Sequence, residues 1–187
     1  MYYGSTDVSF SERGKHLLEK QRDAGLYPTS EDAQYFTTGM LRTEQSLAII
    51  YGEQEHEVIE ELREMAFGEF EMRTYEDLNS IPEYQRWITV EDLGTAPPGG
   101  ESISAFTKRI RRGFDELKVR NELYMLKLRN REKEAMTICI CHGGVISGIM
   151  DYIWPGEHKN FFEWIPDPGH GYVLYVEDGS FTGYGRF

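Results

Sequence analysis

The chain has 187 residues, of which 40% are apolar, so it is long enough for one substantial core, and we expect a single domain over residues 1–187. Its 32 acidic and 20 basic residues give a net charge of −12, which repels nucleic acid and anionic membrane surfaces. No apolar run reaches the roughly 20 residues of a membrane span and no secretory signal pattern is present, so we expect a cytoplasmic protein without nucleic-acid or membrane partners.

The first part of the chain predicts a polar loop, a helix, a strand and a second helix. Ser9 or Ser11 is placed to cap the first helix, and residues 32–38 contain strand-forming side chains. After Gly39 the apolar spacing becomes helical, which places Arg42 in the first turn of the second helix. A cation there opposes the helix dipole and needs a partner. A phosphate group and an ordinary salt bridge to Glu are the two candidates.

The middle of the chain contains a stretch rich in carboxylates and then a long amphipathic helix. Residues 58–71 include Glu64, and one carboxylate of such a stretch, placed in a cleft, has the chemistry of a proton donor, whereas most of the others are solvated. Ser102 is placed to cap a helix from Ile103 to Glu134. We interpret the basic run Lys108–Arg112 as the solvated face of this helix rather than as a binding patch.

Residues 137–148 predict a buried strand, a tight turn and a helix, with His142 at the carboxyl end of the strand. In an α/β sheet this edge is where ligands bind, and a helix N-terminus favours an anion there. The alternative is a His that only bonds a neighbouring carbonyl while the following glycines make the turn. Residues 171–184 predict a C-terminal hairpin with an Asp-Gly turn, and the alternation of strands and helices before it predicts an α/β fold with a largely parallel sheet.

The only two cysteines, Cys139 and Cys141, lie two apart on the predicted strand, so both point to one face and cannot easily form a disulfide. This usage suggests a reducing compartment. A metal site with His142 is one interpretation, but a structural zinc site normally has four ligands, and no other Cys exists. Small buried apolar side chains are the other interpretation, which we favour.

Five motifs, in the same order along the chain, resemble those of the histidine phosphatase superfamily, also called phosphoglycerate-mutase-like. They are Tyr3-Gly4-x-x-Asp7 followed by Ser11-x-x-Gly14; Thr38-x-Met40-x-Arg42-x-x-x-Ser46; Leu62-x-Glu64-x-x-x-Gly68-x-x-Glu71; Pro98-Gly99-Gly100-Glu101-Ser102; and Cys141-His142-Gly143-Gly144-Val145-Ile146. The resemblance runs from Tyr2 to about Gly179.

This resemblance implies a three-layer sandwich, in which helices flank a mostly parallel sheet, and a phosphoryl transfer through a histidine. Arg42 and His142 would then bind the phosphate oxygens, and Glu64 would protonate the leaving alkoxide. Tyr3, Gly4 and Gly143 would line the substrate pocket. The implied partner is a small phosphorylated substrate or inorganic phosphate, and the family needs no metal or organic cofactor, so we expect none.

One departure from the family pattern is large, because no Arg-His-Gly triplet, which in the family carries the nucleophile, occurs in the sequence. We therefore expect that the first strand of the family fold is missing. Either the sequence is a fragment of an ordinary phosphatase or it is a degenerate member that binds without turnover. The retention of Arg42, Glu64 and His142 favours the fragment. We expect little phosphohistidine-dependent activity, exposed sheet edges, and either low stability or a homo-oligomer.

Within the superfamily, the first, third and fourth motifs look most like phosphatases of the α-ribazole phosphatase type. Phosphoglycerate mutases carry a longer basic insertion after the general acid and an Asn where Gly144 stands, so a mutase is the less favoured alternative. Other small phosphate monoesters are equally compatible, because fold and site do not set specificity. A different class, a non-catalytic phosphoanion-binding or scaffold protein, stays open as well.

Overall fold

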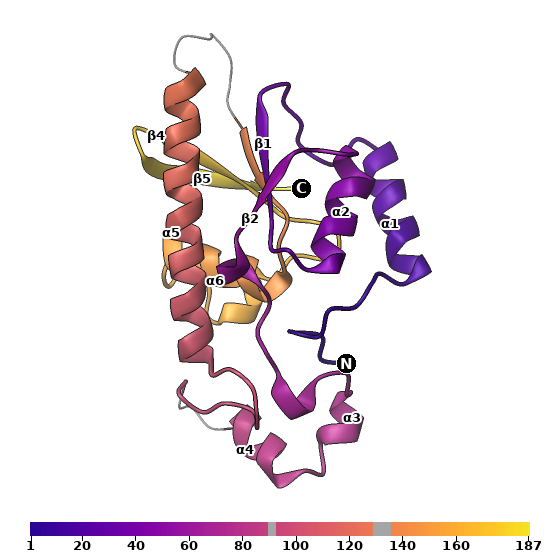
Figure 1. The fold of residues 1–187 in the computed structure, drawn as a ribbon. Coiled ribbons are helices and arrows are strands. Elements are labelled where there is room, and N and C mark those ends of the chain that lie inside the picture. The colour runs from indigo at the N-terminus through magenta and orange to yellow at the C-terminus, as the bar shows by residue number, and fades with distance from the viewer. Residues whose placement is uncertain (90–92, 129–135) are drawn as a thin grey trace.

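The centre of the molecule is a parallel three-stranded sheet. The computed structural model describes residues 1–89, 93–128 and 136–187, and in it the strand order is β2-β1-β3 (Figure 1). Strand β1 (Ala33–Thr37) lies between β2 (His56–Val58) and β3 (Met136–Cys139), and Tyr35 of β1 faces both His56 and Ile138. The predicted strands around residues 32–38 and 137–141 and their parallel pairing are therefore confirmed.

Helices cover both faces of this sheet, which confirms the expected three-layer arrangement (Figure 1). Helices α1 (Glu12–Asp23) and α2 (Leu41–Tyr51) pack against each other on one side, and α5 (Ile103–Leu128) and α6 (Gly143–Ile153) pack against each other on the opposite side. The main core unites side chains from the sheet, from α5, from α6 and from the segment before α3, among them Phe36, Leu62, Ile110 and Val145.

Two predicted helix caps are present. Ser11 is the N-cap of α1, where its Oγ accepts a hydrogen bond from the N–H of Gly14. Ser102 Oγ accepts from the N–H of Ala105 at the start of α5, at 3.1 Å. Helix α5 is described as far as Leu128, and the remainder of the predicted helix to Glu134 lies outside the described residues.

The C-terminal hairpin is also confirmed, as an antiparallel pair of β4 (Tyr172–Glu177) and β5 (Ser180–Arg186). Asp178 and Gly179 between them have φ of 48° and 75°, which is the left-handed backbone that a two-residue type I′ turn requires. The hairpin forms its own two-stranded sheet, and the ring of Phe181 stacks on that of Phe114 in α5 with centroids 5.6 Å apart.

Several short elements were not predicted from the sequence. These are β2, the 3-10 turns η1 (Glu60–Leu62), η2 (Gly68–Phe70) and η3 (Phe161–Trp164), and the helices α3 (Tyr75–Leu78) and α4 (Pro82–Thr89). Three of them, η2, α3 and α4, share a second, smaller core of Phe70, Leu78 and Tyr84 below the sheet in Figure 1. Tyr2 joins this part of the molecule through a parallel bridge with Glu71.

In the described part of the chain β3 pairs with β1 alone, so its other edge has no strand partner there. No strand precedes β1 within residues 1–32, and the absence of the family's first strand stays a prediction.

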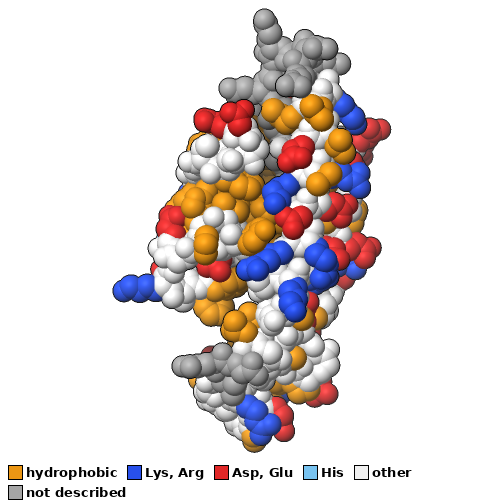
Figure 2. Space-filling model, turned by 90° about the vertical axis from the view of Figure 1, so that its left-hand side faces the viewer, with side chains coloured by type: hydrophobic (Ala, Val, Ile, Leu, Met, Phe, Trp, Pro, Cys, Tyr) orange, Lys and Arg blue, Asp and Glu red, His pale blue; other side chains and the backbone are white. Residues whose placement is uncertain are grey.

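Figure 2 faces α5 and shows charged side chains along the helix with an apolar area beside it. Large apolar side chains that are exposed on α5 and β4 include Leu123, Leu126, Tyr175 and Val176. Among the described helices, none combines the length and apolar character needed to span a membrane.

Candidate active site

The carboxyl ends of β1 and β3 bring Arg42 and His142 together. Phe36 of β1 lies opposite Cys139 of β3, so the segments that follow the two strands leave the sheet side by side. Arg42 lies in the first turn of α2, and His142 is the N-cap of α6. The Nε–H of Arg42 donates a hydrogen bond to Nδ1 of His142 at 3.2 Å. Two residues that are far apart in the sequence therefore share one small site.

His142 is buried and electrically neutral. Its Nδ1 accepts from Arg42, so the proton of the neutral ring resides on Nε2, which lies 3.0 Å from Oγ1 of Thr38 and donates to it. Burial, followed by the positive charges of Arg42 and Arg109, lowers the pKa of His142 to about 3. The imidazole is thus a neutral hydrogen-bonding group, not a cation, at any pH near neutrality.

The remaining hydrogen bonds of Arg42 go to the N-terminal loop. Its Nη2 donates to the carbonyl of Gly4 at 2.7 Å, and its Nη1 donates to the carbonyl of Thr6 at 3.1 Å. The sequence predicted a Glu salt bridge or phosphate as the partner of this cation. In the described residues no carboxylate forms an ion pair with Arg42 within 4.0 Å, so the salt-bridge alternative is wrong. The backbone carbonyls of Gly4 and Thr6 bind its guanidinium, and the negative charges of Glu64, Asp7 and Glu71 act on it without a direct ion pair.

Glu71 holds the same loop from the opposite side. Its carboxylate accepts hydrogen bonds from the backbone N–H groups of Gly4 (3.0 Å), Ser5 (2.8 Å) and Thr6 (3.3 Å) and from that of Phe67 (2.9 Å). Burial acts to raise the pKa of Glu71, but the N–H groups of Gly4, Phe67 and Ser5, together with the hydroxyl of Thr6, outweigh it and hold the pKa below its usual value. The loop is therefore wrapped around an ionised carboxylate while its carbonyls face Arg42.

Glu64 reaches the N-terminus of α6 from the segment after η1. Its Oε2 accepts from the N–H of Gly144 at 3.1 Å, and its Oε1 accepts from the N–H of Met65 at 2.9 Å. Burial raises the pKa of Glu64 in spite of these two hydrogen bonds and of the charges of Arg42 and Arg109, which lower it. A carboxyl group with a raised pKa beside a guanidinium has the properties of a proton donor.

Two glycines of the predicted motifs lie at close approaches, against backbone at Gly4 and against the Glu64 carboxyl group at Gly144. A Cβ on Gly144 would lie 2.5 Å from Oε1 of Glu64, and one on Gly4 would lie 1.9 Å from the carbonyl oxygen of Met65. Gly143 opens α6 and has more room, because its nearest neighbour would be Cγ2 of Ile165 at 3.2 Å. Gly144, which we did not place in the site from the sequence, contacts Glu64 directly.

The structure thus places five of the six predicted site residues around one point: Arg42, His142, Glu64, Gly4 and Gly143. Tyr3 lies in the same loop with its side chain 46% exposed. Their roles in binding and catalysis stay predictions. Sequence reasoning missed Thr38 and Glu71 as parts of the site, although both lie inside the quoted motifs.

Arg109 corrects one interpretation made from the sequence. It belongs to the basic run that we assigned to a solvated helix face, but its side chain is only 21% exposed and forms an ion pair with Glu101 at 2.7 Å. Its positive charge acts on both Glu64 and His142. Nothing in the helical spacing distinguishes it from Arg112, whose side chain is 62% exposed.

The described residues contain no group of three or more His, Cys, Asp or Glu side chains that could hold a metal ion. Cys139 and Cys141 are unpaired and pack against the main core. A hydrogen bond with the thiol of Cys141, together with burial, holds the pKa of Cys139 well above its ordinary value, so this thiol is unreactive near neutral pH.

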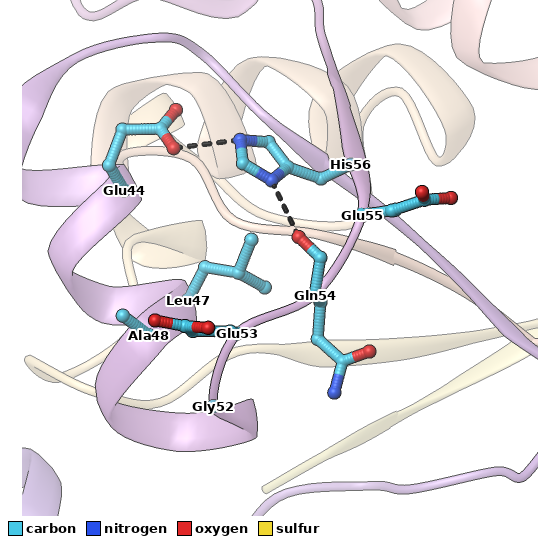
Figure 3. Close-up of a pocket in the computed structure, with 8 residues that line it drawn as sticks. All are labelled: Glu44, Leu47, Ala48, Gly52, Glu53, Gln54, Glu55 and His56. Atoms are coloured by element: carbon cyan, nitrogen blue, oxygen red, sulfur yellow. Dashed lines mark hydrogen bonds and ion pairs between the residues drawn. The ribbon is translucent and has the colours of Figure 1, made fainter.

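A separate cavity of about 440 Å³ lies between α2 and the start of β2, and none of the predicted site residues lines it (Figure 3). Inside it, Nε2 of His56 pairs with the carboxylate of Glu44 at 2.7 Å, and Nδ1 of His56 faces the carbonyl of Gln54 (Figure 3). His56, which we expected in a polar loop, instead begins β2. The pair ties β2 to α2, and Glu44 also bonds the hydroxyl of Thr37.

The family model named Histidine phosphatase superfamily (branch 1) matches residues 1–183. The chain belongs to this superfamily. None of the curated proteins compared with the chain matches it in sequence.

Solved structures share the histidine phosphatase fold with this chain at low sequence identity. The α-ribazole phosphatase from Shigella flexneri is 20% identical and aligns with a TM-score of 0.78 over 97% of this chain and 85% of its own. The protein TTHB049 from Thermus thermophilus is 23% identical and aligns with a TM-score of 0.60 over 90% of this chain and 79% of its own. These likenesses establish the fold, and they agree with the three-layer architecture described above.

Replacing Glu71 by Ala should destabilise this histidine phosphatase domain. Four backbone N–H groups and two hydroxyls would lose a charged acceptor, so we expect the free energy of unfolding to fall by about 2–3 kcal/mol. Urea unfolding followed by circular dichroism measures the change. Glu69→Ala, at an exposed position two residues earlier, is the matched control and should change stability by less than about 0.5 kcal/mol. Equal effects of the two substitutions would contradict the anchoring role of Glu71.

His142 should contribute a pH-dependent share of stability with a defined sign. Its pKa in the folded protein is about 3, below the roughly 6.5 of an unfolded chain, so the unfolded state binds the proton first as the pH falls. The contribution is complete above about pH 6.5 and is lost progressively on acidification towards pH 3.

Between pH 7.5 and pH 5 the native chain should therefore lose about 2 kcal/mol more unfolding free energy than the His142→Gln variant does. Urea titrations at both pH values measure the difference, and His16→Gln on the exposed face of α1 is the control. Identical pH profiles for the native chain and His142→Gln would show that His142 is not held neutral.

Proposed function

We propose that this chain carries the phosphate site of a phosphomonoesterase that acts on a small phosphorylated metabolite. The observation that supports the proposal most directly is the convergence of Arg42, His142 and Glu64 at the ends of β1 and β3. Membership of the histidine phosphatase superfamily supplies the reaction class. The likeness to the Shigella flexneri α-ribazole phosphatase makes α-ribazole phosphate one candidate substrate among other small monoesters.

The chemistry assigned to each residue follows from its charge state. Arg42 is a guanidinium fork that suits two oxygens of a phosphate, and neutral His142 adds a hydrogen-bonding group beside it. Glu64, with its raised pKa, would donate a proton to the leaving alkoxide and then accept one from the attacking water. The N-terminus of α6 adds the positive end of a helix dipole next to these groups.

We further propose that a polypeptide of these 187 residues binds phosphate but turns phosphomonoesters over slowly. It contains no Arg-His-Gly triplet, and its other histidines are placed elsewhere: His16 on α1, His56 on β2, and His158 and His170 around η3 and β4. His142 itself is bonded on both ring nitrogens. These observations support a site that lacks a phosphoryl acceptor.

A non-catalytic phosphoanion-binding role is the second candidate. The sequence retains Arg42 and His142 but contains no Arg-His-Gly triplet, which favours binding of a phosphate group without its transfer. The two candidates differ in turnover. A p-nitrophenyl phosphate assay on the purified chain that shows turnover abolished by His142→Ala would exclude the non-catalytic role.

Substituting Arg42 should weaken phosphate binding. We expect Arg42→Gln to raise the dissociation constant for inorganic phosphate at pH 7.5 by about tenfold to a hundredfold, because a charge-assisted pair of hydrogen bonds is lost. Isothermal titration calorimetry measures the constant. Arg13→Gln removes the same charge from an exposed position on α1 and should leave it unchanged. Equal dissociation constants for Arg42→Gln and the native chain would place the phosphate elsewhere.

We also propose that copies of this chain associate. The support is the edge of β3, which has no strand partner in the described residues, because such edges promote pairing between chains. Sedimentation velocity over a hundredfold range of protein concentration should show a concentration-dependent increase in sedimentation coefficient. A monomer throughout this range, with a two-state thermal transition, would contradict the proposal.

A further inference from the structure

Arg109 makes a hydrogen bond with every N–H group that it has. Its Nε–H and one Nη2–H donate to the two carboxylate oxygens of Glu101, at 3.0 Å and 2.7 Å. The exposed fractions of the two side chains are 21% and 17%, so this bidentate pair is largely shielded from water. The guanidinium plane is therefore held in one orientation.

The other three N–H groups bind consecutive parts of the backbone just before and at Glu64. They donate to the carbonyls of Glu61 (2.8 Å), Arg63 (2.8 Å) and Glu64 (3.3 Å). This segment is a 3-10 turn that ends at Leu62 and continues without regular secondary structure. Carbonyls of such irregular backbone need an outside donor, and here one arginine of α5 supplies all three hydrogen bonds.

The backbone after Glu64 is fixed to the same region of the chain. The N–H of Glu101 donates to the carbonyl of Ala66 at 2.8 Å, and the N–H of Glu69 donates to the carbonyl of Pro98 at 2.9 Å. The two segments lie so close that a Cβ on Gly100 would approach the carbonyl oxygen of Ala66 to 2.7 Å. The backbone on both sides of Glu64 is thus attached to residues 98–109.

Glu64 depends on this attachment because its carboxyl group has to reach another element. Its Oε2 meets the N–H of Gly144 on α6, two residues after His142. The charged and titratable groups that act on it are Arg42 of α2 and Arg109 of α5, with His142 at the N-cap of α6. A shift of the 61–64 backbone would remove the carboxyl group from Gly144.

We propose that Arg109 is the positioning residue for Glu64: together with Glu101, it holds the 61–64 backbone where the carboxyl group reaches the N–H of Gly144. The inference rests on the proposed function, in which Glu64 is the proton donor of the phosphate site. It deepens that function because Arg109, a residue outside the site, would determine where the carboxyl group of Glu64 lies.

The amide proton of Gly144 provides the test, because its hydrogen-bond acceptor is Glu64. In ¹H–¹⁵N spectra of the native chain the Gly144 amide shift should follow the titration of Glu64, and Glu64→Gln should abolish that dependence. Arg109→Lys keeps the positive charge but cannot form the fork and the backbone bonds together. In this variant we expect the Gly144 shift to lose its pH dependence and its amide to exchange at least about tenfold faster.

Arg112→Lys is the matched control. Arg112 lies three residues further along α5 and bonds the carboxylate of Glu61 at 3.0 Å, but its side chain is 62% exposed and its bonds reach no backbone carbonyl of residues 61–64 in the described contacts. The pH dependence and exchange rate of the Gly144 amide should stay as in the native chain. All spectra are compared at a temperature at which circular dichroism shows each variant folded.

Two results would overturn the proposal. One is an Arg109→Lys chain that melts at a lower temperature yet retains the native pH dependence and exchange of Gly144, because Arg109 would then stabilise the fold without placing Glu64. The other result applies if Arg109→Lys does not fold. In that case Glu101→Gln, which releases one side of the guanidinium fork, is used instead, and a Gly144 amide with native pH dependence and native exchange rate would overturn the proposal. Calorimetry with inorganic phosphate on the native chain tests the proposed function separately from the placement of Glu64. Absence of binding would refute the proposed function. Loss of the pH dependence of the Gly144 amide in Arg109→Lys would still support the placement of Glu64 by Arg109.

Discussion

The parallel pairing of β1 with β3 is the constraint on which the rest of this molecule depends. Because the strands run in the same direction and Phe36 lies opposite Cys139, the segments that leave their carboxyl ends enter α2 and α6 side by side. This places Arg42 beside His142, with Nε of Arg42 3.2 Å from Nδ1 of His142. A slip of the register by one residue would turn every side chain of one strand to the opposite face of the sheet and would shift the segment that follows that strand relative to its neighbour.

The electrostatics of the site follow from burial acting on groups of different charge type. Burial disfavours the charged form of each group, so it lowers the pKa of His142 and raises that of Glu64. Glu71 is less deeply buried, and hydrogen bonds from the N–H groups of Gly4, Phe67 and Ser5 and from the Thr6 hydroxyl outweigh the effect of its burial. Two carboxyl groups seven residues apart therefore take opposite states: one is an anchoring anion and the other a group poised to hold a proton.

The elements of the sheet and its helices could be predicted because their signals are local. The β-branched run before His142, the glycines after it and the helical spacing that follows specify strand, turn and helix within about a dozen residues. The residues of the candidate site were predicted through motifs that keep their order along the chain. The role of Arg109 could not be predicted from the sequence. Helical periodicity indicates which side of α5 Arg109 faces, but it does not indicate that the irregular backbone of residues 61–64 lies against that side. Strand β2 was missed for a related reason: its three residues are exposed and contain no apolar alternation.

The N-terminal loop links these features into one energetic unit. Its N–H groups are bound by Glu71 and its carbonyls by Arg42, so the loop lies between an anion and a cation. If phosphate binds as proposed, it would compete with the carbonyls of Gly4 and Thr6 for the same guanidinium, and its affinity would be the difference between the two sets of bonds. The tighter Glu71 holds the loop in place, the less freely those carbonyls can withdraw. Under the proposed function, the stability of the loop and the affinity for phosphate would therefore depend on the same group of hydrogen bonds.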